Sequence, residues 1–168
     1  MHFGNLVVIP ADEKLGTIEE RIQKAMGPHE ENGGFWDWYQ IGGRWTGTLD
    51  NYDPEKDPAN IEVCSTCQGT GVRKDMVVQN GCNACNGKGI KSVWPTQFKN
   101  HPGDMMPVDN LTDEHMSKFY RIIYPDKDGR KKYHIIEENH SNLKNVVNCI
   151  WLKENFKGYL AVVVDNHS

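Results

Sequence analysis

Two octets, Cys64-Ser-Thr-Cys67-Gln-Gly69-Thr-Gly71 and Cys82-Asn-Ala-Cys85-Asn-Gly87-Lys-Gly89, decide how the middle of this chain folds. Both follow the pattern Cys-x-x-Cys-x-Gly-x-Gly, and 14 residues separate the two pairs of cysteines. Two residues between cysteines let both sulfur atoms face one ion, and the glycines allow the chain to reverse tightly around it. The spacing predicts one structural zinc ion held by four thiolates, with no coordination position left for water.

The four predicted ligands, Cys64, Cys67, Cys82 and Cys85, could instead form two disulfides, a redox dithiol pair or an iron centre. Disulfides are rare in cytosolic proteins, and a redox Cys-x-x-Cys usually occurs once, in a βαβ context. Both considerations favour zinc. The fifth cysteine, Cys149, flanks the apolar side of a predicted helix, and we expect it to be a small packing residue.

The paired octets resemble the cysteine-rich zinc-binding region of DnaJ-type co-chaperones, over residues 61–91 only. That family has four octets and two zinc ions, so two octets imply one ion. The His-Pro-Asp turn of the family's J-domain has its nearest counterpart in His101-Pro102-Gly103-Asp104, which departs from it. The resemblance therefore implies a zinc module that contacts proteins, and it does not imply stimulation of a chaperone ATPase.

A second resemblance covers the run Trp36-Asp-Trp-Tyr-Gln-Ile-Gly-Gly-Arg-Trp45. It is similar to a run in small uncharacterised bacteriophage proteins, some of which also close on Val-Asp-x-His, like Val164-Asp165-Asn166-His167. This resemblance brings no known activity. It implies a phage accessory protein in the host cytoplasm, whose partner is a host or defence-system protein.

Outside the octets, the pattern of apolar residues predicts an α+β fold. The continuous run Leu6–Ile9 suits a strand buried on both faces, and residues 159–164 predict a closing strand. Thr17 and Glu20 form a capping box for a helix that ends near Gly27. Two hairpins are expected, over residues 35–49 and 119–136. A last helix is expected to begin at Ser141, with an apolar stripe made by Leu143, Val146, Val147, Ile150 and Trp151.

This order of elements favours a ferredoxin-like, mainly antiparallel sheet with two helices on one face. We expect residues 1–168 to form a single α+β domain that carries residues 61–91 as an inserted zinc-binding module.

The first hairpin is expected to turn at Gly42-Gly43, because a two-residue turn needs positive φ at both positions. That register places Trp36, Trp38, Trp45 and Leu49 on a core face. The opposite face carries Asp37, Tyr39 and Arg44, which form either a site where Arg44 clamps an anion or an ordinary cross-strand Asp–Arg pair.

Asp165 and His167 lie two residues apart on the closing strand and therefore point to the same side. With His2 or His134 nearby they could bind a second metal ion or transfer protons, and otherwise they belong to a polar tail.

Composition narrows the function classes. The chain has 168 residues, 38% of them hydrophobic, and a net charge of −4. We expect a cytoplasmic protein without a signal peptide or membrane span, and the acidic balance does not favour nucleic acid as a partner. No catalytic motif stands out, which favours a non-enzymatic zinc-binding protein that contacts other proteins. The alternative is a protein, possibly an enzyme, directed at nucleic acid or nucleotides through Asp37, Arg44, Asp165 and His167. A chaperone holdase is a third option.

Overall fold

The computed structural model describes residues 1–29, 36–50, 52–53, 56–75, 81–92, 103–126, 132–137 and 147–168. The chain divides into two compact units, one formed by Met1–Tyr52 with Thr96–Ser168 and the other by Asp53–Pro95. The predicted zinc module, residues 61–91, lies inside the second unit. That it folds as an independent insert stays a prediction.

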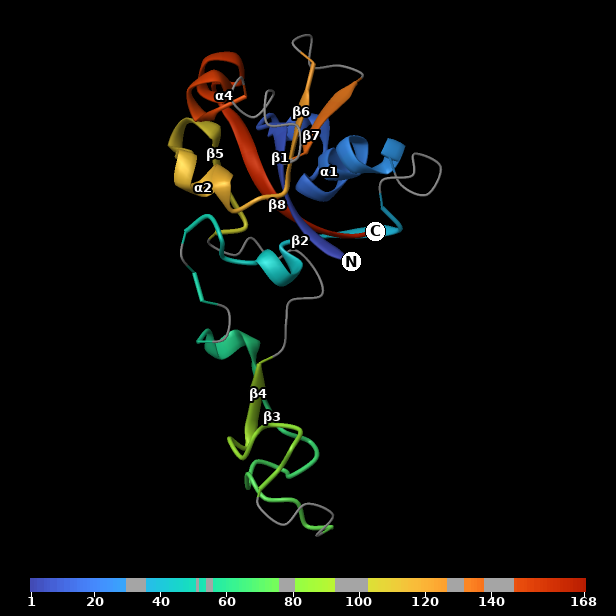
Figure 1. Cartoon of the computed structure of the whole chain (residues 1–168), viewed down its shortest axis with the longest axis vertical. Helices are drawn as coiled ribbons and strands as arrows, with labels where there is room; N and C mark the ends of the chain where they lie inside the picture. The colour runs from blue at the N-terminus through green and yellow to red at the C-terminus, as the bar shows by residue number, and fades with distance from the viewer. Residues whose placement is uncertain are drawn as a thin grey trace. The chain divides into compact units, whose positions relative to one another are not determined.

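The first unit holds a mixed sheet and short helices (Figure 1). Its strands are β1 (His2–Pro10), β2 (Trp38–Ile41), β5 (Met105–Pro107), β6 (Arg121–Pro125), β7 (Tyr133–Glu137) and β8 (Tyr159–His167). Its α-helices are α1 (Ile18–Met26), α2 (Asp113–Ser117) and α4 (Cys149–Asn155), and its 3-10 turns are Glu13–Leu15, Gly27–His29, Gly43–Trp45 and Val108–Asn110. The second unit contains the 3-10 turn Pro58–Asn60 and the ribbon of β3 (Ile61–Val63) and β4 (Ile90–Ser92).

The sheet of the first unit has the order β2-β8-β1-β6-β7, and β5 also pairs with β8. Strands β1 and β8 are antiparallel from His2↔His167 to Pro10↔Tyr159, as the blue and red strands of Figure 1 show. Strands β1 and β6 are parallel direct neighbours, and the other described pairings in this sheet are antiparallel. The ferredoxin-like topology is therefore wrong in its strand order, because a split β-α-β unit places another strand between its two parallel strands.

Helices cover both faces of the sheet, not one face as expected. Val7 and Ile9 pack with Ile22, Ala25 and Met26 of α1 on one face. On the other face, Leu6 and Val8 pack with Met116 of α2, Leu152 of α4 and Phe156, the residue that follows α4. The physical reason is that β1 and β8 are apolar at consecutive positions, so neither face of these strands can be left in water.

Several local predictions are confirmed. Helix α1 begins after Thr17, which accepts a hydrogen bond from the N–H of Glu20 while the Glu20 carboxylate accepts one from the N–H of Thr17. The capping box satisfies two backbone donors at the helix start. The second hairpin is formed by β6 and β7, with Ile122 opposite Ile136.

The first predicted hairpin is wrong. Strand β2 pairs with β8 instead of with residues 44–49, and the chain after it enters the 3-10 turn Gly43–Trp45. Gly42 and Gly43 do have positive φ, of 71° and 56°, but they begin the 3-10 turn Gly43–Trp45 instead of a hairpin turn. A Cβ on Gly43 would lie 2.5 Å from the Cβ of Asp165, so the glycine allows this turn to pack directly on β8.

The predicted core face of that hairpin is only partly correct. Trp36 and Leu49 are buried, whereas Trp38 is exposed. Trp45 is partly buried and its indole covers Gly4 of β1, where an added Cβ would lie 2.5 Å from the Trp45 Nε1 atom. An aromatic ring thus covers a strand glycine in this sheet.

The last helix is shorter in the described residues than the sequence predicted. Asn148 caps α4 by accepting a hydrogen bond from the N–H of Trp151. Residues 141–146, including the predicted cap Ser141, lie outside the described residues. Cys149 and Leu152 face the core and Ile150 is exposed, so the predicted stripe is rotated. Cys149 is buried, and its thiol donates to the carbonyl of Leu111, as suits a packing residue.

Within the part of the chain that the structure describes, no helix is long and apolar enough to cross a bilayer.

Candidate metal centre

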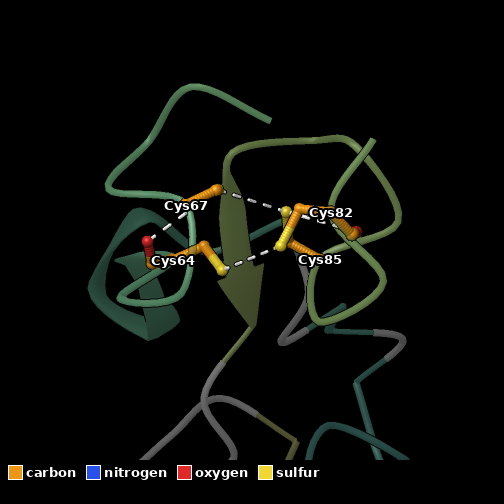
Figure 2. A group of neighbouring side chains, drawn as sticks. All are labelled: Cys64, Cys67, Cys82 and Cys85. Carbon is orange, nitrogen blue, oxygen red and sulfur yellow. Dashed lines mark hydrogen bonds between the residues drawn. The ribbon is translucent and has the colours of Figure 1, made fainter. Parts of the chain in front are cut away.

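Four buried cysteine side chains converge in the second unit (Figure 2). The Sγ atoms of Cys64, Cys67, Cys82 and Cys85 all lie within 4.8 Å of one another. The Sγ atoms of Cys64 and Cys82 are 3.9 Å apart, and those of Cys67 and Cys85 are 3.7 Å apart. A zinc tetrahedron with bonds of about 2.3 Å has sulfur–sulfur edges of about 3.8 Å. The spacing of the thiols therefore fits one zinc ion.

None of these cysteines is in a disulfide, and their sulfur atoms lie well beyond covalent distance. The four thiols would supply all four ligands of such an ion, which is typical of a structural zinc site. Such a site holds the chain in shape and has no open position at which to activate water.

Each pair of cysteines lies on a tight turn whose backbone has the same form in both octets. Gln68 and Asn86 have φ of 52° and 49°, and the glycines that follow them, Gly69 and Gly87, have φ of 84° and 77°. The N–H of Gly87 donates to the carbonyl of Cys82 at 3.0 Å. Because a left-handed backbone costs least at glycine, the Cys-x-x-Cys-x-Gly pattern allows the chain to reverse at each of these two turns, which we call the knuckles.

The second glycine of each octet packs against the first glycine of the other. A Cβ on Gly71 would lie 2.3 Å from the carbonyl oxygen of Gly87, and a Cβ on Gly89 would lie 2.3 Å from that of Gly69. The two knuckles thus meet through their backbones, in a reciprocal arrangement. This contact fixes the distance between the two pairs of cysteines.

The thiols have unequal affinities for protons when no cation is present. Burial raises the pKa of the Cys85 thiol to about 11, and the neighbouring thiols act in the same direction. Burial also raises the pKa of Cys64, but hydrogen bonds from the backbone of Cys67 and Thr66 and from neighbouring thiols outweigh it and bring the pKa to about 6. Four thiolates together require a compensating positive charge, which a divalent metal ion supplies.

One basic side chain, Arg73, lies beside the cluster. Arg73 donates from Nε to Asp75 at 2.9 Å and from Nη1 to Asn83 of the second octet at 3.1 Å. Its pKa is raised, chiefly by the hydrogen bond to Asp75 and further by the charge of Cys82. Arg73, two residues after the first octet, therefore connects that part of the chain to the second octet and partly offsets the negative charge of a zinc–thiolate centre.

The other predicted site residues come together only in part, around the start of β1 and the end of β8. Arg44 reaches Asp165 through its backbone N–H, at 3.2 Å. Tyr39 donates its hydroxyl to Gln23 of α1. Asp37 accepts a hydrogen bond from Nδ1 of His167 at 2.9 Å, whereas Asp165 is buried and pairs with Nδ1 of His2 at 3.0 Å. The hairpin that was expected to bring Asp37, Tyr39 and Arg44 onto one face does not form, because β2 pairs with β8.

Sequence reasoning placed His2 near Asp165 and His167 only as one option, and it missed Trp38 as their neighbour. His2 and Trp38 lie on the two strands that flank β8, both opposite His167. The signal that finds them is strand register, which requires knowing that β8 lies between β1 and β2.

The chain matches no protein-family model, no curated protein and no solved structure with which it was compared. The resemblances to DnaJ-type zinc regions and to bacteriophage proteins therefore stay predictions.

Proposed function

We propose that the protein is a non-enzymatic zinc-binding protein whose second unit contacts another protein. The observation that carries the proposal is the set of four buried thiols at distances that fit one zinc ion. A closed thiolate site gives structure to a short segment that has few apolar residues of its own to bury.

An exposed apolar pair lies next to this site and supports a role in protein contact. Val63 and Ile90 are directly opposite each other on the β3–β4 ribbon and are 67% and 44% exposed. Val63 also contacts the first knuckle, because a Cβ on Gly69 would lie 3.3 Å from its Cγ1 atom. Large apolar side chains that cluster on a surface are typical of protein-binding sites.

The same ribbon borders an open pocket of about 350 Å³, lined by Ile61, Cys85, Lys88 and Lys91 among others. Its lysines add positive charge beside the apolar pair. These features favour a partner surface that combines an apolar side chain with carboxylates. The run at residues 36–45 supports a phage accessory role, in which that partner is a host or defence-system protein.

Two measurements test this function. Native mass spectrometry of the full chain is expected to show one zinc ion, and chelation is expected to release it and to unfold residues 61–92. A crosslinking pull-down from host cells should then recover a reproducible partner with the zinc-loaded protein.

The matched variants are Val63→Thr with Ile90→Thr, which keep β-branched shape but add hydroxyls, and Ile150→Gln, which alters an exposed apolar residue of the first unit. We expect the double variant to lose the partner and Ile150→Gln to retain it. The proposal is contradicted if the chain holds less than half an equivalent of zinc, or if the double variant binds the partner as well as Ile150→Gln does.

The alternative, a protein directed at nucleic acid or nucleotides through Asp37, Arg44, Asp165 and His167, gains no specific support. Its two carboxylates are already paired with histidines, and they repel phosphate groups.

A further inference from the structure

The first unit contains a pair of histidines that each bind a carboxylate through the same ring nitrogen. Nδ1 of His2 donates to Oδ1 of Asp165 at 3.0 Å, and Nδ1 of His167 pairs with Oδ2 of Asp37 at 2.9 Å. In the neutral form of both rings this hydrogen bond fixes the tautomer, with the proton on Nδ1 and a lone pair on Nε2.

Strand pairing brings the two rings together. His2 lies directly opposite His167 on neighbouring antiparallel strands, and their ring centroids are 5.3 Å apart. Directly opposite residues in such a pair have Cβ atoms about 5 Å apart, which suits joint binding of one ligand. The backbone N–H of Asp37 also donates to the carbonyl of His167 at 2.8 Å, so the sheet itself holds the carboxylate at that position.

The two histidine side chains reach solvent, and neighbouring groups hold them in place. His2 and His167 are 21% and 37% exposed, whereas the side chain of Asp165 is only 3% exposed. Asp165 also accepts a hydrogen bond from the backbone N–H of Arg44. The indole of Trp38 stacks on His167 with the ring planes 4° apart and the centroids at 5.9 Å. The ring of His167 is therefore held between a carboxylate and an aromatic plane.

Charge decides what such a pair can bind. With both imidazoles neutral, the two aspartates bring two negative charges, which the Met1 ammonium group beside His167 partly offsets. The remaining negative charge attracts a divalent cation and repels a phosphate. Histidines that bind metals usually donate the other ring N–H to a carboxylate. Nε2 of His167 now lies 3.2 Å from the nitrogen of Met1, a hydrogen bond that a metal ion would replace.

We propose that His2 and His167 form a second metal site, separate from the thiolate centre, which binds a borderline divalent transition metal through the two Nε2 atoms. Asp165 and Asp37 orient the ligands, and water fills the remaining coordination positions. Imidazole ligands favour zinc, copper, nickel and iron over magnesium or calcium.

The test uses the full chain, free of any histidine tag and already loaded with zinc, titrated with nickel chloride. Paramagnetic nickel bound beside Trp38 is expected to quench tryptophan fluorescence in a saturable manner, and Trp38→Phe is expected to remove most of that change. His2→Gln and His167→Gln should each weaken nickel binding at least about tenfold, and Asp37→Asn about tenfold. His134→Gln, which alters an exposed histidine on β7, is the matched control and should bind nickel as the unmodified chain does.

Circular dichroism and zinc content establish that each variant is folded. The proposal is overturned if folded His2→Gln or His167→Gln binds nickel with unchanged affinity, or if the unmodified chain shows no saturation at millimolar nickel. Zinc content of the thiolate centre is read separately, so loss of this site leaves the proposed function untouched.

Discussion

Substitution of single glycines in the two octets tests the reciprocal packing of the knuckles. Gly71 and Gly87 have nearly the same backbone, with φ of 73° and 77°. An alanine at either position in the left-handed region costs about 1–2 kcal/mol. The positions differ in their surroundings, since a Cβ on Gly71 would lie 2.3 Å from a backbone oxygen, whereas a Cβ on Gly87 has its nearest neighbour at 3.9 Å.

Gly71→Ala must therefore push the two knuckles apart by roughly 1 Å to restore van der Waals contact, and overpacking of this kind adds about 1–3 kcal/mol. Because metal binding and folding of the unit are coupled, these costs appear as lost zinc affinity. At about 1.4 kcal/mol for each factor of ten, Gly87→Ala should weaken zinc binding about tenfold, and Gly71→Ala by about 30-fold to several thousandfold.

The assay is competition for zinc between the full chain and a chromophoric chelator of known affinity. Gly89→Ala should behave like Gly71→Ala, since its Cβ would also lie 2.3 Å from a backbone oxygen. Equal losses for Gly71→Ala and Gly87→Ala would refute the reasoning, because the steric difference between the two sites would then have no effect.

Three further predictions concern the first unit. Arg121→Ala should lower the free energy of unfolding by about 2–3 kcal/mol in urea titrations, because it leaves Glu137, 2.7 Å away, without its buried partner. Lys118→Ala removes a 3.8 Å pair with the exposed Glu114 and a 3.4 Å hydrogen bond to the carbonyl of Thr48, and should cost under about 1 kcal/mol. Burial raises the pKa of Tyr133 to about 12, so the folded state favours the neutral ring. The stability that the neutral Tyr133 ring contributes is then fully present below a pH of about 10 and is lost as the pH rises towards about 12. Tyr133→Phe should therefore reduce the fall in the urea midpoint between these two pH values. Cys149→Ala should leave the zinc content unchanged by mass spectrometry and lower stability by about 1 kcal/mol, since this thiol lies in the core of the first unit; any loss of zinc would contradict its exclusion from the centre.

Features of the fold that depend on near neighbours in the chain were predictable. The Cys-x-x-Cys spacing places two thiols on one turn, and four such thiols meet in the structure. The cap at Thr17 involves residues three apart, and the β6–β7 hairpin joins adjacent strands. In each case the energy that selects the structure comes from contacts within a short window of sequence.

The prediction of the first hairpin was wrong because the Gly42-Gly43 pair suits more than one kind of turn. Positive φ at Gly42 and Gly43 suits both a two-residue hairpin turn and the observed 3-10 turn. The competing partner for residues 38–41 is β8, more than 120 residues further along the chain. Nothing near Gly42 encodes that pairing, and without it the pattern of alternating residues could not show that Trp38 is exposed.

The arrangement of helices could have been inferred more fully. Consecutive apolar residues in Leu6–Ile9 and Ala161–Val164 leave no polar face on either strand, so helices on both faces follow from the sequence. The pairing of His2 with Asp165 could not be inferred in this way. It depends on the register of β1 against β8, which is set by the whole length of both strands.

The position of β8 affects how the protein emerges from the ribosome. This strand pairs with β1, β2 and β5, yet it is translated after all of them. In a nascent chain, the edge of β1 that pairs with β8 therefore stays unpaired until residues 159–167 have left the exit tunnel. At about 5–20 residues per second, the time between synthesis of β1 and synthesis of β8 is many seconds. The thiolate knuckles need only residues 64–89, so metal capture can precede assembly of the sheet. A nascent chain whose residues 64–89 have left the tunnel while residues 159–167 have not can therefore hold a metal-loaded thiolate cluster while β1 still lacks its β8 partner.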